Sequence, residues 1–155
     1  MPAFTEFADR VFPGLEKGGF HAAYYRVLEA FARGRIRRLM VTIPPQHGKS
    51  LGATTLLPAY MLGLDPDLKI AIASYSAALA NRFNKRVQRI MDSALYRALF
   101  PGTSIKRAGE RSDYVRTADM AEVIGCSGEL LSVGREGSLT GNRVDVFILD
   151  DLYKD

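Results

Sequence analysis

The hydrophobic residues of this chain follow two kinds of pattern that alternate along it. Runs of adjacent apolar residues, with the length of buried parallel strands, occur at 39–43, 69–74 and 144–149. Apolar residues at helical spacing or helix-compatible stretches occupy 20–33, 49–62 and 77–91, the second with Pro58 as a possible kink. This alternation predicts an α/β fold in which helices flank a central, mostly parallel sheet.

The remaining segments have different patterns. Residues 1–19 are mixed and glycine-rich near their end, which predicts a loose lead-in with at most one short helix. Residues 103–140 are rich in glycine and contain short alternating segments, so we expect small strands or hairpins at 114–117, 122–125 and 130–133. We therefore divide the chain into a lead-in, 1–19, and one domain, 20–155.

A candidate phosphate-binding loop lies between the first predicted strand and the following helix. Its residues are Pro45, Gln46, His47, Gly48, Lys49 and Ser50. Backbone N–H groups at such a helix start bind phosphates, a glycine allows close approach, the lysine reaches the β/γ phosphates, and the serine hydroxyl binds Mg²⁺. Ile43 stands where the full pattern has another glycine, so a chance Gly-Lys-Ser is the alternative. The strand, turn and helix around the loop favour an ATP site.

A candidate magnesium-binding pair follows the last apolar run. Asp150 and Asp151 come directly after Phe147-Ile148-Leu149, as in a Walker B strand. We expect Asp150 to hold Mg²⁺ and Asp151 to orient or activate the attacking water. The alternative is an acidic turn after a buried strand. Many proteins with this arrangement have Glu at the second position, and Asp is one methylene shorter.

Composition restricts the class of protein. The chain has 155 residues, a net charge of +4 and a pI near 9.3, which permits a polyanionic partner without requiring one. Cys126 is the single cysteine, so no internal disulfide is possible, as suits a reducing cytosol. The uncharged stretch 51–64 is too short to span a bilayer, so we expect no membrane association.

Several ordered motifs carry a family resemblance over roughly residues 20–155. They are Pro44-Pro45-Gln46-His47-Gly48-Lys49-Ser50, Pro58-Ala59-Tyr60, Leu62-Gly63-Leu64-Asp65-Pro66, Ser74-Tyr75-Ser76, Leu99-Phe100-Pro101-Gly102, and Leu139-Thr140-Gly141-Asn142-Arg143 before Asp150-Asp151. In this order and spacing they resemble the N-terminal ATPase domain of phage terminase large subunits. That family typically has arginine where this chain has Gln46, which puts a charge-sensing role for this position in doubt.

The resemblance implies a P-loop NTPase of the additional-strand type that uses ATP and Mg²⁺ to drive double-stranded DNA into a procapsid. It also implies a homo-oligomeric ring on the portal protein, a small terminase subunit as partner, and the cytoplasm of the bacterial host as location. The chain stops four residues after Asp151. We therefore expect a partial motor domain without the family's nuclease domain.

Three further sets of residues are weaker candidates. His21 lies where related motors place an adenine contact, although packing of its helix would also explain it. A motor ring needs an arginine from a neighbouring subunit, for which Arg143 and Arg135 are candidates. A basic stripe on the third helix would contact DNA phosphates, unless it is only a solvated face; it consists of Arg82, Lys85, Arg86 and Arg89.

Two other functions remain open at this point. One is a degenerate or truncated remnant that binds nucleotide without turning it over. The other is a different P-loop ATPase that acts on nucleic acid, such as a helicase, although the order of the motifs and the absence of helicase signatures argue against it.

Overall fold

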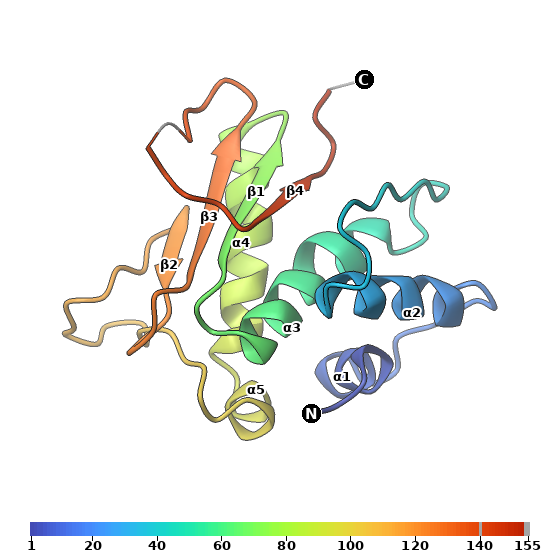
Figure 1. Ribbon diagram of the computed structural model, residues 1–155, viewed down its shortest axis with the longest axis horizontal. Helices are drawn as coiled ribbons and strands as arrows, with labels where there is room; N and C mark the ends of the chain where they lie inside the picture. The colour runs from blue at the N-terminus through green and yellow to red at the C-terminus, as the bar shows by residue number, and fades with distance from the viewer. Residues whose placement is uncertain (140, 154–155) are drawn as a thin grey trace.

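A four-stranded mixed sheet forms the centre of the molecule in the computed structural model, which describes residues 1–139 and 141–153 (Figure 1). The strand order is β2-β3-β1-β4, with bounds Met120–Glu122, Glu129–Gly134, Lys69–Ser74 and Val146–Leu149. β1 pairs in parallel with β3 and β4, whereas β2 is antiparallel to β3. The predicted α/β class is confirmed, and the sheet is partly antiparallel. Thr140, part of one motif above, and residues 154–155 lie outside the described residues.

The predicted strand at 39–43 is wrong: these residues are irregular and pair with no strand. Their exposure alternates, and Met40 is 91% exposed. A cleft of about 460 Å³ separates them from β4, with Leu39 and Val41 on one wall and Val146 to Leu149 on the other. An apolar run becomes a strand only where a neighbouring strand offers hydrogen bonds, and here the nearest strand lies across the cleft.

The glycine-rich region agrees with the prediction in part. Residues 130–133, expected as a small strand or hairpin, lie in β3, which pairs antiparallel with β2 and also joins the core of the sheet, where Leu130 lies opposite Ile70 of β1. The segment 122–125 overlaps β2 only at Glu122, and 114–117 contributes one isolated bridge, between Arg116 and Ala121. The alternating pattern thus predicted the strand at 130–133, but not its parallel pairing with β1 inside the sheet.

The helices agree more closely with the sequence. They are α1 (Phe4–Val11), α2 (His21–Ala32), η1 (Leu51–Leu56), α3 (Leu57–Leu64), α4 (Ala77–Met91) and α5 (Ala94–Leu99). The predicted helix at 49–62 exists, but its first part, η1, is π-wound. Pro58, which has no N–H to donate, follows this wider turn directly and lies in the first turn of α3.

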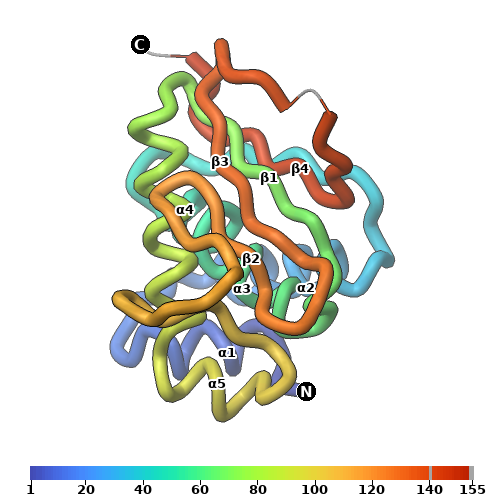
Figure 2. Tube along the Cα trace, turned by 90° about the vertical axis from the view of Figure 1, so that its left-hand side faces the viewer, coloured from blue at the N-terminus to red at the C-terminus, as the bar shows by residue number. Residues whose placement is uncertain are grey.

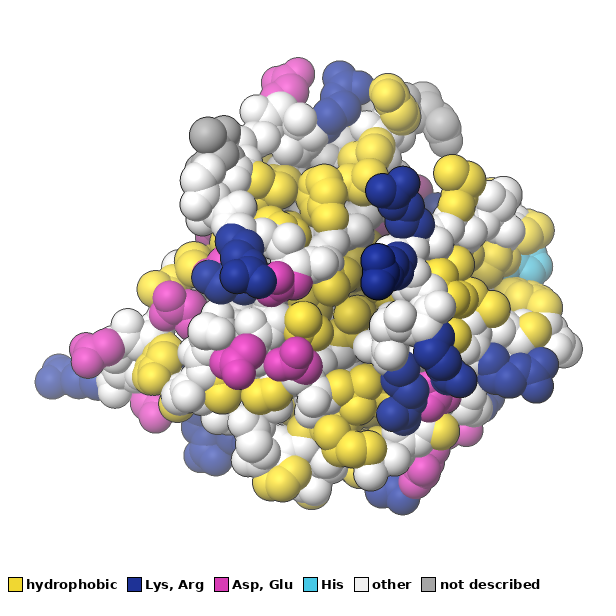
Figure 3. All heavy atoms as spheres, in the orientation of Figure 1, with side chains coloured by type: hydrophobic (Ala, Val, Ile, Leu, Met, Phe, Trp, Pro, Cys, Tyr) yellow, Lys and Arg dark blue, Asp and Glu magenta, His cyan; other side chains and the backbone are white. Residues whose placement is uncertain are grey.

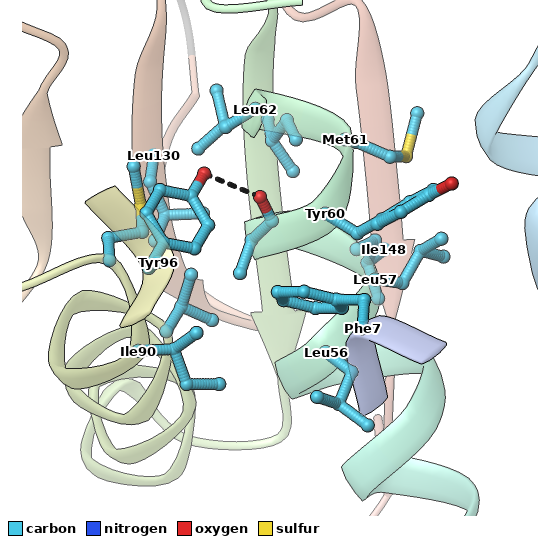
Figure 4. Packing of buried hydrophobic residues seen from close by; sticks show 14 of the residues in the cluster. Phe7, Leu56, Leu57, Tyr60, Met61, Leu62, Ile90, Tyr96, Leu130 and Ile148 are labelled. Carbon is cyan, nitrogen blue, oxygen red and sulfur yellow. Dashed lines mark hydrogen bonds between the residues drawn. The ribbon is translucent and has the colours of Figure 1, made fainter. Parts of the chain in front are cut away.

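The lead-in is not loose, because α1 packs into the core. Phe4 and Phe7 are fully buried, and their rings contact those of Tyr25, Tyr60 and Phe100. Figure 4 shows Phe7 beside Tyr60 and Leu56, and the Tyr96 hydroxyl donating a hydrogen bond of 2.7 Å to the carbonyl of Ala59. Burial of the Tyr96 ring raises the pKa of its hydroxyl, which therefore stays a neutral donor.

The two faces of the sheet are covered differently. α4 packs on one face, where the buried Asn84 amide donates to the Leu130 carbonyl and the Ser132 hydroxyl. On the other face Phe147 and Leu149 of the edge strand β4 are 51% and 56% exposed. Figure 3 shows hydrophobic side chains gathered at the centre of the molecule, between groups of Lys and Arg side chains. β4 thus carries an exposed apolar face as well as an unpaired edge.

Candidate nucleotide-binding site

The loop before η1 has the backbone shape of an anion-binding turn. Gln46 and Gly48 have positive φ values of 64° and 80°. At each of these two residues the chain turns sharply, as it does in loops whose backbone N–H groups bind anions. The Gly52 N–H donates to the Gly48 carbonyl at 3.0 Å, which starts the helical winding immediately after the loop. The predicted phosphate-binding loop thus lies directly before the start of a helix, the place in a protein where anions are commonly bound; phosphate binding here stays a prediction.

A cleft of about 530 Å³ opens at this loop. That volume is within the range of small-molecule sites. The predicted residues Pro45, Gln46, Gly48, Lys49 and Ser50 line it, and Tyr75, Asp151 and Tyr153 form the opposite side. Predicted loop residues and the second predicted carboxylate thus share one cavity.

Two side chains of α2 donate hydrogen bonds to backbone carbonyls of the loop. The Gly18 N–H donates to His21 Nδ1 at 2.8 Å, so Nε2 carries the ring proton and donates to the His47 carbonyl at 3.1 Å. The Tyr24 hydroxyl donates to the Lys49 carbonyl at 2.7 Å. Both ring nitrogens of His21 are therefore occupied by backbone groups, which gives this residue a structural role here; an adenine contact stays a prediction.

The acidic pair, Asp150 and Asp151, lies directly after β4, at the carboxyl ends of the parallel strands. Asp150 is 5% exposed, and its carboxylate accepts a hydrogen bond of 2.6 Å from the Thr54 hydroxyl. Ser74, at the end of β1, donates to the Asp150 carbonyl at 2.8 Å. Asp151 has φ 47° and a side chain 51% exposed, and its carbonyl accepts from the Tyr75 N–H at 2.9 Å. One carboxylate is buried and fixed, and the other faces solvent.

Lys49 connects the loop to the acidic pair. Its Nζ lies 3.3 Å from Oδ1 of Asp150 and 3.5 Å from Oδ1 of Asp151. Partial burial opposes the charged form, but the two carboxylates outweigh it and raise the pKa of Lys49, so the ammonium stays charged at neutral pH. Lys49 and Asp151 line both the loop cleft and the cleft beside β4, whereas Ser50 lines only the first and Asp150 only the second.

The other candidates differ in how close they lie to this centre. Arg143 precedes β4, at the strand end opposite Asp150, and pairs with Asp145 at 3.2 Å. Arg135 follows β3 on the side of the acidic pair, and its guanidinium lies 5.5 Å from the ring centroid of Tyr153, which lines the loop cleft. The four basic residues of α4 are exposed on that helix. An arginine acting in a neighbouring subunit stays a prediction for both Arg143 and Arg135.

Sequence reasoning missed three residues of the site. Thr54 holds Asp150, Ser74 holds the backbone after β4, and Tyr75 lines the cleft. Ser74 and Tyr75 follow a predicted strand at the sheet edge where ligands bind, which is a usable signal. For Thr54, five residues after Lys49, the signal is weaker. Whether its side chain points toward the sheet depends on the winding of the helix, which the sequence does not show.

The donor atoms fit Mg²⁺ chemically. A serine hydroxyl and an aspartate carboxylate are hard oxygen ligands, and Mg²⁺ usually takes one or two carboxylates together with phosphate and water. Among the described residues, no group of three or more His, Cys, Asp or Glu side chains could hold a metal ion. No helix in the described part of the chain is long and apolar enough to cross a membrane.

Comparison with known proteins identifies the family. Residues 40–155 match the model of the terminase large subunit, T4-like-virus type, N-terminal part. No curated protein and no solved structure matches the chain. The match covers both chemical motifs and all four strands of the sheet. The chain belongs to the T4-like-virus-type family of terminase large subunits, in the N-terminal region of that protein.

Proposed function

We propose that the chain is the ATPase motor domain of a terminase large subunit, which couples ATP hydrolysis to the translocation of viral double-stranded DNA into a procapsid. Membership of the family suggests a role in DNA packaging. The observation that carries the ATPase proposal is the position of Lys49, whose ammonium lies within 3.5 Å of both carboxylates while its backbone belongs to the loop. In this proposal the phosphate-binding and metal-binding groups meet at the carboxyl ends of the parallel strands β1 and β4, which is where P-loop NTPases bind nucleotide.

Each residue then has a defined task. The loop N–H groups and Lys49 bind the β/γ phosphates, and Ser50 and Asp150 would hold Mg²⁺, which neutralises phosphate charge when bound. Asp151, exposed at the mouth of the cleft, orients or activates the attacking water. We further propose that the protein acts in the cytoplasm of the bacterial host, as a ring on the portal protein with the small terminase subunit.

Nucleotide binding tests this proposal directly. Lys49→Ala removes the charge that contacts the phosphates, and a charged hydrogen bond contributes about 1.5 kcal/mol or more, so affinity for a fluorescent ATP analogue should fall roughly tenfold or more. Lys69→Ala is the control, because Lys69 forms an ion pair with Glu129 at the opposite end of β1. Equal affinities for the two variants and the unmodified chain would refute the loop assignment. Nucleotide binding without any turnover in the full-length protein would instead indicate a nucleotide-binding remnant.

The hydrogen bond from Thr54 gives a second test. Thr54→Val removes the donor to the Asp150 carboxylate, so Mg²⁺-dependent nucleotide affinity should fall by about tenfold, since a hydrogen bond to a charged group contributes about 1.5–3 kcal/mol. Titration of Mg²⁺ at fixed nucleotide measures this effect, and Thr54→Ser should restore it.

The neighbouring Thr55 is a matched control. It is equally buried, but its hydroxyl has no hydrogen-bond partner among the described residues. Thr55→Val should therefore leave Mg²⁺ dependence unchanged and should not lower the free energy of unfolding. A loss of Mg²⁺ dependence in both valine variants would mean that helix packing, and not the bond to Asp150, sets the affinity.

A further inference from the structure

The positive charge of the chain is concentrated in one segment. Residues 82–119 contain nine basic and four acidic residues, a net charge of +5. The rest of the chain contains twelve basic and thirteen acidic residues, a net charge of −1. This segment comprises most of α4, then α5 and the irregular stretch 103–119, and Figure 2 shows that stretch running beside α4.

The α4 cations are not neutralised by the protein. Arg82, Lys85, Arg86 and Arg89 are all exposed, at spacings that place them on one side of the helix. None of them forms an ion pair with any described residue. The buried side of the same helix is apolar or amide-bearing, with Phe83, Val87 and Gln88.

The stretch 103–119 brings further cations to this helix. A groove of about 440 Å³ runs between them, lined by Lys85 from α4 and by Lys106 and Arg107 from the irregular stretch. Arg116 fixes that stretch against α4. Its guanidinium donates to the Gln88 side chain at 3.1 Å, to the Asp92 carboxylate at 3.3 Å, and to the carbonyl of Lys106.

The tip of the stretch is a tight turn between Arg107 and Glu110. The Glu110 N–H donates to the Arg107 carbonyl at 3.1 Å, and the Glu110 carboxylate accepts from the Arg107 N–H at 2.9 Å. Gly109 has φ 78° and open space where a side chain would lie. Glu110 lines the same groove as Lys85, Lys106 and Arg107, but its carboxylate is bonded to a backbone N–H and forms no ion pair with these cations. The Lys106 ammonium donates to the Ser112 carbonyl at 3.3 Å.

We propose that α4 and the stretch 103–119 form one surface that binds the phosphodiester backbone of double-stranded DNA, through Arg82, Lys85, Arg86, Arg89, Lys106 and Arg107. The inference deepens the proposed function, because it names the surface that holds the substrate of the motor. Its basis is charge complementarity: a group of cations, none of which forms an ion pair with any described residue, matches a regular row of phosphates. Contacts to phosphates carry no sequence information directly, so we expect this binding to be independent of sequence.

Salt dependence of DNA binding tests the surface. Anisotropy of a labelled duplex, measured without nucleotide between about 50 and 200 mM salt, gives the slope of log K against log salt, which changes by about 0.9 for each phosphate contact. Replacing Lys85, Lys106 and Arg107 with Gln should reduce the slope by about 2 to 3. The control replaces Arg26, Arg35 and Arg38, which are exposed and form no ion pair with any described residue, and should leave it nearly unchanged.

Lysine acetylation provides an independent readout on the unmodified chain. Duplex DNA should protect Lys85 and Lys106, but not Lys17 or Lys69. Equal slopes for the two triple variants, together with no protection of Lys85 and Lys106, would overturn the proposal. So would stronger binding to an acidic polypeptide than to the duplex. Because these measurements contain no nucleotide, their outcomes are separate from a failure of the ATP site.

Discussion

Asp151→Asn is expected to preserve nucleotide binding and to reduce ATP hydrolysis by about 10²-fold or more, the size of a lost general base. Two features indicate that this substitution should not disturb the structure around Asp151. The Asp151 side chain is 51% exposed, and Lys49, which lies 3.5 Å from it, keeps Asp150 as a second partner, so the substitution leaves no buried donor unpaired. Its φ of 47° is a conformation that Asn adopts readily, so the backbone should not change.

Asp150→Asn should have a different effect. Its carboxylate is buried and held by Thr54 and Lys49, so an amide there removes a charge from the metal-binding position. Mg²⁺-dependent nucleotide binding should weaken, and hydrolysis should fall as a consequence. Both variants are to be compared by nucleotide titration and steady-state ATPase assay in the full-length protein assembled on its partners. Hydrolysis at the unmodified rate by Asp151→Asn would place the catalytic carboxylate elsewhere.

Gly128→Ala is expected to destabilise the fold by about 3 kcal/mol or more, at the upper end of the effects of overpacking. A Cβ at this position would lie 2.1 Å from the carbonyl oxygen of Pro66 and 3.0 Å from that of Leu68. Both are backbone atoms, so no side-chain rotation relieves the collision. Gly128 also accepts from the Val123 N–H at 2.9 Å, and Glu129 donates to Leu68 at 3.1 Å, which fixes the start of β3.

Gly102→Ala is the matched control for this prediction. Gly102 has no positive φ and no atom within 4 Å of an added Cβ, so alanine should be neutral or slightly stabilising. Urea unfolding of both variants measures the difference. If Gly128→Ala unfolds at the same urea concentration as Gly102→Ala, the close approach of β3 to the turn at Pro66 is wrong.

The sequence predicted the parts of the fold whose signals are local. α4 matches its predicted range of 77–91, and β1 matches 69–74, because each has the periodicity or continuous apolar run of its type. Pairing is not local. Residues 39–43 have a strand-like composition but no partner, and β3 has alternating exposure although it lies inside the sheet. Which run pairs with which depends on contacts between distant residues.

The site shows the same division. The loop and the acidic pair were predicted because each is a short motif with a known chemical reason. The contact between Lys49 and Asp150 follows only once β4 is placed beside β1. The stabilising roles of His21, Tyr24 and Thr54 depend on how helices cross behind the loop, which no spacing in the sequence reveals. Arg116, which positions part of the basic surface, is likewise invisible without its partners on α4.

The exposed edge of β4 has a consequence for the handling of this protein. Val146 to Leu149 are four uncharged, β-prone residues with an unpaired edge and two exposed apolar side chains, which are features of aggregation-prone segments. Asp145 precedes them, and Asp150 and Asp151 follow. Carboxylates in these positions repel a second copy of the strand and act as gatekeepers against self-association. We therefore expect the acidic pair to protect solubility in addition to its proposed role at the nucleotide site, and the concentration of monomer should be measured before any rate is compared between the Asn variants.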